Sequence, residues 1–263
     1  MIESSIATAP APRCKICSQP TAHFIRCDFH ANAKLHMGYY ARAINPSGVM
    51  LDYFRCTGCG FLFTPFMDDW DGSKFAQFVY NKDYPLLDGS YNGHRAGALA
   101  NILYLGFHDM MGQLDFLDYG GGLGIQSALL AAFGARRSIT YDPFAANAKR
   151  PEGLFNVVTS LEVLEHSVDP KKTAADLVSL FDHDNGFLFA TTELLPDNIA
   201  TQKDNWWYIC PRVGHISFYT PQALGHLFVP HGFKILHVEN HSHIIFKKWP
   251  IWAQRFFEVS ELG

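Results

Sequence analysis

The feature that most constrains the fold is a short apolar segment that runs directly into a cluster of glycines. Residues 116–124 read FLDYGGGLG, and the apolar segment IQSALLAAFGA follows at residues 125–135. Glycines gather where the backbone needs positive φ or where another group approaches the main chain closely. The pattern predicts a buried strand, a tight loop and a helix, with the loop as a candidate binding site.

Strand-like and helix-like segments alternate after this loop. The predicted strands span residues 137–142, 154–161 and 186–193, and the predicted helices span residues 170–181 and 220–228. This alternation is typical of a doubly wound, mostly parallel sheet with helices on both faces. Two closing strands in residues 233–248 turn near Asn240 and are expected to be antiparallel. We therefore predict an α/β, Rossmann-like fold with its ligand at the carboxyl ends of the strands.

The spacing of the glycines argues against a dinucleotide. The third glycine of a G-x-G-x-x-G loop is missing, whereas Gly120, Gly122 and Gly124 follow the pattern G-x-G-x-G. Asp118 precedes the loop, and Asp142 ends the next predicted strand. A carboxylate at that second position can accept hydrogen bonds from both hydroxyls of a ribose. The pattern disfavours an NAD-dependent dehydrogenase.

Three segments resemble, in order, the motifs of class I S-adenosylmethionine-dependent methyltransferases. They are FLDYGGGLG at residues 116–124, YDP at 141–143 and FNVVTSLEVLEHSVDP at 155–170. The resemblance covers roughly residues 114–246, and its cofactor has no pyrophosphate that would need the third glycine. The cofactor-binding residues that we assign are Tyr80, Tyr84, Asp118, Gly120, Gly121, Gly122, Gly124, Asp142, Pro143, Ser160, Leu161 and Glu162.

The resemblance implies a role for each part of this set. The glycine loop would meet the methionine part and the ribose of the cofactor through its backbone amides. Asp118 would orient the loop or attract the amino group, and Asp142 would bind the ribose. Residues 160–162, at the end of the next strand, would border the methionine arm.

The chain departs from the family pattern after Asp142. The segment that leads to Asn156 is too short for the helix, strand and acidic residue that the family commonly has there. Asn156 itself stands where the family usually has aspartate. We therefore predict a truncated third-strand region, with adenine held by apolar walls or main chain and with Pro143 and Phe144 as candidate contacts.

Four of the six cysteines form two C-x-x-C pairs. Two such pairs suit tetrahedral Zn²⁺ with four thiolate ligands, and a closed site of this kind is structural because it has no open position. The predicted ligands are Cys14, Cys17, Cys56 and Cys59, whereas Cys27 and Cys210 are expected to be ordinary buried cysteines.

These features divide the chain into three predicted parts. They are a small zinc-ribbon-like module at residues 1–66, a helical linker or cofactor lid at 67–113 and a methyltransferase core at 114–263. A zinc module ahead of such a core is similar to the sugar C-methyltransferases that act on nucleotide-linked deoxysugars, in which tyrosines of the linker help to cover the cofactor. Tyr80 and Tyr84 stand at the matching places, and packing on a helix face is the alternative for both.

Methyl transfer positions two reactants, and an oxygen or carbon acceptor also needs a base near the transferred methyl group. We predict His215 as the base and Glu193, at the end of the fourth strand, as its partner or a second base. His166 is expected to support the cofactor loop, and Glu165 to pack or to bind a neighbouring backbone group.

Composition and charge bear on the acceptor. The net charge is −4 with an isoelectric point near 6.3, so no basic field favours nucleic acid. No apolar run reaches the length of a membrane span and the N-terminus does not resemble a signal peptide, so we expect a cytoplasmic protein. The histidines at 237, 241 and 243 are interpreted as surface residues.

We therefore predict methyl transfer to a small or medium-sized acceptor such as a sugar, a lipid-like metabolite or a natural-product intermediate. Two alternatives remain open. One is an RNA or protein methyltransferase that uses the zinc module for docking, and the other is a non-catalytic cofactor-binding module. The sequence leaves the oligomeric state open.

Overall fold

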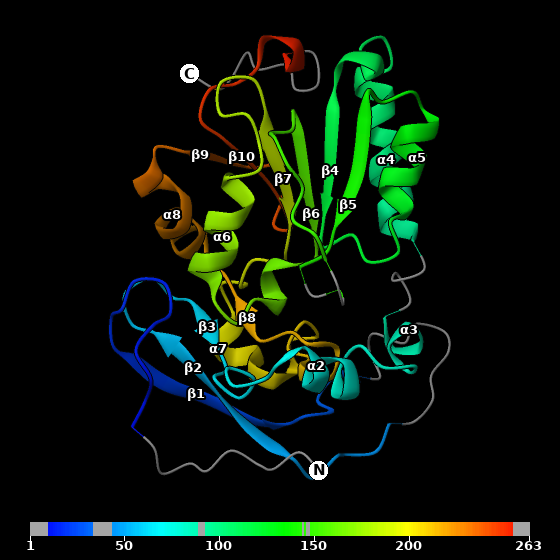
Figure 1. The fold of residues 1–263 in the computed structure, drawn as a ribbon. Coiled ribbons are helices and arrows are strands. Elements are labelled where there is room, and N and C mark those ends of the chain that lie inside the picture. Colours follow the sequence, from blue (N-terminus) through cyan, green and yellow to red (C-terminus); the bar gives the residue numbers. More distant parts are fainter. Residues whose placement is uncertain (1–9, 34–43, 89–92, 144, 146–147, 255–263) are drawn as a thin grey trace. The chain divides into compact units, whose positions relative to one another are not determined.

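The computed structural model describes residues 10–33, 44–88, 93–143, 145 and 148–254 (Figure 1). Phe144 and the first nine residues of the N-terminal tail lie outside these ranges. The chain forms two compact units, and each is built from stretches that are not contiguous in sequence. We call them the cysteine unit (residues 1–92, 164–171 and 192–227) and the sheet unit (residues 93–163, 172–191 and 228–263).

The sheet unit contains a six-stranded sheet in the order β5-β4-β6-β7-β10-β9. Its strands are β4 (Asp115–Tyr119), β5 (Arg137–Tyr141), β6 (Val157–Leu161), β7 (Phe187–Thr191), β9 (Lys234–His237) and β10 (Ser242–Phe246). Strands β5, β4, β6 and β7 are parallel to one another, while β10 is antiparallel to both β7 and β9. The prediction of a parallel-rich sheet that ends in an antiparallel pair is therefore confirmed.

Helices pack on this sheet because their apolar residues lie on one face. Helix α5 (Ile125–Ala132) contacts β4 and β5, and α4 (His94–Phe107) lies beside α5 (Figure 1). Along the chain, helix α6 (Pro170–Val178) connects β6 to β7, and α8 (Pro221–Phe228), most of which belongs to the cysteine unit, precedes β9. The buried cluster beneath α4 and α5 includes Leu99, Leu103, Phe107, Phe116, Leu130, Val157, Phe187 and Ile244.

Strand β5 is an edge strand of this sheet. Of the residues between Asp142 and Asn156 that the structure describes, none belongs to a helix or a strand. The guanidinium group of Arg137 donates hydrogen bonds to the backbone oxygens of Glu152 and Leu154, at 3.1 and 3.0 Å, and so holds the returning segment. Over the described part of this segment no strand intervenes between β5 and β6, as its shortness predicts.

The cysteine unit contains a four-stranded antiparallel sheet in the order β1-β2-β3-β8. Its strands are β1 (Thr21–Asp28), β2 (Met50–Cys56), β3 (Leu62–Phe63) and β8 (Ser217–Phe218). Three short helices also belong to this unit: α2 (Gly72–Phe78), α3 (Tyr84–Leu87) and α7 (Ile199–Gln202). Strand β8 comes from the second half of the chain, so the cysteine unit combines residues from both halves.

Residues 164–167 are tied to the segment that contains β8 by several hydrogen bonds. The backbone N–H of Ile216 donates to the backbone oxygen of Glu165 at 2.9 Å. The hydroxyl of Tyr219 donates to the oxygen of Leu164 at 2.8 Å, and the hydroxyl of Ser217 donates to that of Ser167 at 2.7 Å. These bonds place the end of the sequence LEVLEHS directly against the segment around His215. Within the described ranges, no helix has the length and apolar character needed to cross a bilayer.

Candidate functional site

The loop between β4 and α5 has the backbone conformation that its glycines predict. Gly120, Gly122 and Gly124 have φ values of 73°, 49° and 71°, in the left-handed region that side chains disfavour. Gly124 is also the residue that caps the N-terminus of α5. The loop therefore turns tightly from the strand into the helix, with the first N–H groups of α5 at its end.

Close packing also favours glycine at two positions of the loop, Gly120 and Gly121. A Cβ atom at Gly120 would lie 2.5 Å from a methyl group of Val163, and one at Gly121 would collide with the carboxyl group of Asp118. The backbone at Gly121 therefore lies directly against the side chain of Asp118 in β4. No other residue type fits at Gly121 without displacing Asp118.

Asp118 is the electrostatically unusual residue of this loop. Its side chain is buried, and its Oδ2 atom has no hydrogen-bond partner among the residues that the structure describes. Burial, and to a smaller extent the negative charge of Asp142, raise the pKa of Asp118 to about 7. An unsatisfied buried carboxyl group is costly, and a ligand that donates a hydrogen bond or carries positive charge would remove that cost.

The structure places most of the predicted cofactor residues at the carboxyl ends of three adjacent parallel strands. Asp118 and the glycines follow or end β4, Asp142 and Pro143 follow β5, and residues 160–162 end β6. Glu162 has a φ of 53°, and its carboxylate forms a 3.3 Å ion pair with Arg95. Sequence reasoning missed Arg95, because nothing in the pattern of α4 marks it as a partner of β6.

The predicted linker tyrosines lie in the cysteine unit. The ring centroids of Tyr80 and Tyr84 are 5.1 Å apart, and the ring of Tyr80 is 6.1 Å from that of His166. Tyr84 is buried and Tyr80 is more than one-third exposed. Tyr80 therefore borders His166, and Tyr84 packs against Tyr80.

His215 belongs to a buried polar cluster in the same unit. One ligand atom from each of Glu165, His166 and His215 lies within 4.8 Å of the others. The hydroxyl of Tyr208 donates a 2.7 Å hydrogen bond to Oε1 of Glu165, and Nδ1 of His215 lies 2.8 Å from the backbone oxygen of Tyr208. Glu193, the predicted partner of His215, is not a member of this group of three.

Sequence reasoning gave Glu165 and His166 supporting roles only and did not single out the hydroxyl of Tyr208. The adjacent glutamate and histidine at 165 and 166 were the available signal for a titratable cluster. Arg212, another polar residue of this region, donates hydrogen bonds to the oxygen of Val79 and to Oδ1 of Asn81, both at 3.0 Å.

The four predicted cysteine ligands come together in the cysteine unit. The Sγ–Sγ distances are 3.7 Å for Cys14 and Cys59, 3.4 Å for Cys17 and Cys56, and 3.5 Å for Cys17 and Cys59. Four sulfurs at about 2.3 Å from a tetrahedral Zn²⁺ ion are about 3.8 Å apart. The arrangement therefore has the donor set and nearly the spacing of a zinc site.

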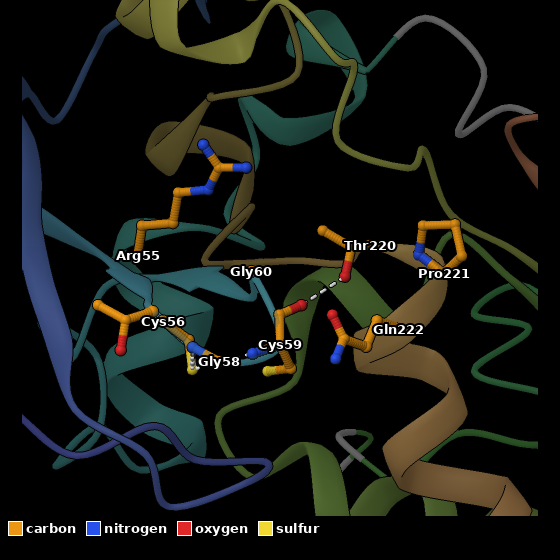
Figure 2. A pocket seen from close by; sticks show the side chains of 9 residues that line it. Arg55, Cys56, Gly58, Cys59, Gly60, Thr220, Pro221 and Gln222 are labelled. Carbon is orange, nitrogen blue, oxygen red and sulfur yellow. Dashed lines mark hydrogen bonds between the residues drawn. The ribbon is translucent and has the colours of Figure 1, made fainter.

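The turns around these cysteines orient the sulfur atoms. The N–H groups of Gly58 and Cys59 point at Sγ of Cys56, with distances of 3.3 and 3.4 Å (Figure 2). The hydroxyl of Thr220 donates a 2.6 Å hydrogen bond to the oxygen of Cys59. Beside this turn is an open hollow of about 700 Å³, lined by residues 55–60 and 220–222.

The sheet order and the glycine loop of the sheet unit define a mixed α/β protein with the Rossmann-like fold of class I methyltransferases. A family model described as "Methyltransferase domain" matches residues 91–238, which is more than half of the chain. The chain belongs to this methyltransferase family and is an S-adenosylmethionine-dependent methyltransferase. A search of curated protein sequences matched none.

Several solved structures are similar to the chain. One is magnesium protoporphyrin IX methyltransferase from Synechocystis PCC 6803 with bound S-adenosylhomocysteine, at 17% identity and a TM-score of 0.41, covering 58% of this chain and 82% of that one. The mitomycin 7-O-methyltransferase MmcR has 14% identity and a TM-score of 0.47, with 68% and 62% covered. Human N-acetylserotonin methyltransferase has 13% identity and a TM-score of 0.42, with 68% and 63% covered. This chain thus spans about three fifths of the length of the last two.

The residues of the sheet unit fit S-adenosylmethionine on two structural observations. The orphaned Oδ2 atom of Asp118 can accept a hydrogen bond from a cationic amino group. The loop from Gly120 to Gly124 turns from β4 into α5 with positive φ at three glycines and carries a side chain only at Leu123, so a ligand can approach its main chain.

Proposed function

We propose that this enzyme transfers a methyl group to an oxygen or carbon atom of a small or medium-sized metabolite, such as a sugar, a lipid-like molecule or a natural-product intermediate. The observation that carries the proposal is the glycine loop beside the buried carboxyl group of Asp118, whose Oδ2 atom has no hydrogen-bond partner among the described residues. The chain's slightly acidic net charge of −4 supports a small acceptor over RNA.

The cofactor-binding roles follow from the chemistry of each residue. Asp118 accepts hydrogen bonds from the cofactor's amino group and is ionised when it does so. Asp142 accepts hydrogen bonds from the ribose hydroxyls, and the loop amides meet the methionine part. When bound, S-adenosylmethionine supplies an electrophilic methyl group whose bond to sulfur breaks as the acceptor atom bonds to the carbon.

Removal of the acceptor's proton is proposed to involve His215. The hydrogen bond between its Nδ1 and the oxygen of Tyr208 requires a proton on Nδ1, which leaves a lone pair on Nε2. That lone pair can take a proton directly, or it can bind an ion that makes the acceptor more acidic. Glu193, in the segment after β7, remains the predicted second base.

The cysteine cluster is proposed to hold one Zn²⁺ ion with a structural role. Four sulfurs would occupy all four positions of a tetrahedral ion, so no position remains for a substrate. The ion would fix the turn after β2 against the N-terminal segment. The spacing of the four sulfurs supports this assignment.

The test of the proposed function is a methyl-transfer assay with labelled S-adenosylmethionine. The acceptors offered are a panel of nucleotide-linked sugars and phenolic metabolites, in parallel with total RNA and denatured protein. We expect label in at least one small acceptor and expect His215→Gln to lower the rate by at least 100-fold. Transfer to RNA or protein alone would refute the assignment of a small acceptor.

A further inference from the structure

The buried cluster around His215 has the composition of a metal site. Two imidazoles and one carboxylate, from His166, His215 and Glu165, offer ligand atoms within 4.8 Å of one another, and all three side chains are buried. Imidazole and carboxylate ligands in this two-to-one ratio bind Zn²⁺, Fe²⁺ and related ions. This group shares no residue with the cysteine cluster.

We propose that Glu165, His166 and His215 bind one divalent transition-metal ion, which forms a second metal site in the cysteine unit. Two ligands at about 2.1 Å from the same ion can be no more than about 4.2 Å apart. Nε2 of His166 and Oε1 of Glu165 are already 3.9 Å apart. The third ligand atom, from His215, lies within 4.8 Å of the other two.

The surroundings of the cluster orient its ligands as the second shell of a metal site does. The backbone oxygen of Tyr208 fixes the tautomer of His215, because it accepts the proton on Nδ1 and leaves Nε2 for the ion. The hydroxyl of the same tyrosine donates to Oε1 of Glu165 at 2.7 Å. One residue thus orients two of the three ligands.

The backbone around the cluster is also built to bring the two histidines together. Gly214 has a φ of 94°, and a Cβ atom there would lie 2.7 Å from Nδ1 of His166. The absence of a side chain at Gly214 lets the ring of His166 pack edge-on against that of His215, with ring centroids 5.0 Å apart. The hydrogen bond between Ile216 and Glu165 ties the two segments together.

Three protein ligands leave at least one position of the ion open. A water molecule or a hydroxyl oxygen of an acceptor would take that position, and the ion would lower the pKa of that hydroxyl. Ion binding would occupy the lone pair on Nε2 of His215, so His215 would act as a ligand and not as the base. This catalytic role rests on the proposed function, whereas the ion binding itself does not.

The experiment measures the metal content of the full-length protein after Co²⁺ is added to chelator-treated protein, with no cofactor present. We expect two Co²⁺ ions per chain: one with the intense absorption of thiolate ligands and one with only the weak bands of nitrogen and oxygen ligands. Glu165→Gln and His166→Gln should each lose the second ion and keep the first. Tyr208→Phe should lower the affinity for the second ion about 10- to 100-fold, because it removes a hydrogen-bond partner of the ligand Glu165.

His243→Gln is the matched control, because His243 is a fully buried histidine of the sheet unit that lies outside the cluster. It should keep both ions. Absence of the nitrogen- and oxygen-ligated ion from the wild-type protein, or unchanged binding of that ion in folded Glu165→Gln, would overturn the proposal. Methyl transfer that fails while two ions bind would refute the proposed function alone.

Discussion

Asp118 and Asp142 stand at the carboxyl ends of two neighbouring strands of a parallel sheet, and burial together with the negative charge of Asp142 raises the pKa of Asp118. Asp118 lies in β4, Asp142 directly follows β5, and Asp118 is paired with Thr140 in the register of the two strands. Burial is the larger cause of the raised pKa, and the charge of Asp142 adds to it. The site therefore holds a carboxyl group that is half-protonated near neutral pH until a cationic ligand arrives.

Replacement of Asp118 by asparagine should change how stability depends on pH. Because the pKa of Asp118 is about 7 in the folded protein and ordinary when unfolded, the folded state binds the extra proton between about pH 4 and pH 7. Stability contributed at this position is thus lost as the pH rises through that window. Asp118→Asn should leave the free energy of unfolding unchanged at pH 4 and raise it at pH 8, by at most about 4 kcal/mol.

Urea unfolding of the cofactor-free protein at the two pH values measures this difference. The same variant should bind S-adenosylhomocysteine more weakly than the wild-type protein at pH 8. An equal effect of the substitution on stability at both pH values would contradict the raised pKa of Asp118.

A methyl group added at Gly121 should disrupt the glycine loop between β4 and α5. The new Cβ atom would collide with the carboxyl group of Asp118, so either the loop or that side chain must move. We expect Gly121→Ala to weaken S-adenosylhomocysteine binding at least 10-fold by isothermal titration calorimetry. Gly225→Ala is the control, because a Cβ atom in the middle of α8 meets nothing within 4 Å. Equal affinities of the two variants would contradict the close approach.

Loss of the carboxylate at residue 142 should weaken cofactor binding. Asp142→Ala removes charge-assisted hydrogen bonds to the ribose, with an expected cost of about 1–3 kcal/mol. Removal of the same charge should also lower the pKa of Asp118. Asp184→Ala, at an exposed position of the same unit, is the control. Unchanged affinity for S-adenosylhomocysteine in Asp142→Ala would refute the ribose assignment.

Cys56→Ser should release the proposed zinc ion. Sγ of Cys56 lies 3.4 Å from that of Cys17 and accepts two backbone N–H groups, so its loss breaks a closed site. We expect the zinc content measured by mass spectrometry to fall by one ion per chain and the melting temperature to fall. Cys27→Ser is the control, because Cys27 is equally buried but lies outside the cluster. Equal zinc contents in the two variants would count against the assignment.

Local patterns in the sequence were sufficient to predict the sheet unit. The segment from Phe116 to Gly124 predicts a buried strand followed by a tight loop, because apolar strand-forming residues lead directly into consecutive glycines. The antiparallel final pair followed from the few residues between its strands, and the loss of a strand after β5 followed from the shortness of its segment. These features depend on residues that are close together in the sequence, so a single sequence is enough to predict them.

Features that depend on distant contacts could not be predicted. Strand β8 joins β3 in the register of Leu62 with Phe218, and nothing in a two-residue strand indicates its partner. The expectation that the hairpin histidines lie at the surface was wrong for His243. It is fully buried, and its Nδ1 lies 3.0 Å from that of His237 on the neighbouring strand. The turn near Asn240 pairs those two residues across the two antiparallel strands.

The cluster of Glu165, His166 and His215 illustrates the same limit. The sequence marked His215 as a candidate base but assigned the neighbouring pair to other roles. Their meeting depends on the left-handed backbone at Gly214 and on the hydrogen bond between Ile216 and Glu165. Both features depend on contacts between two segments that are far apart in the sequence.

The most direct test of the central claim is a crystal structure of the protein with S-adenosylhomocysteine bound. The account predicts that the nucleoside lies over the backbone from Gly120 to Gly124, with both ribose hydroxyls in hydrogen-bond contact with Asp142 and the amino group at Asp118. Density for the ligand at any other place, or a ribose that does not contact Asp142, would contradict it.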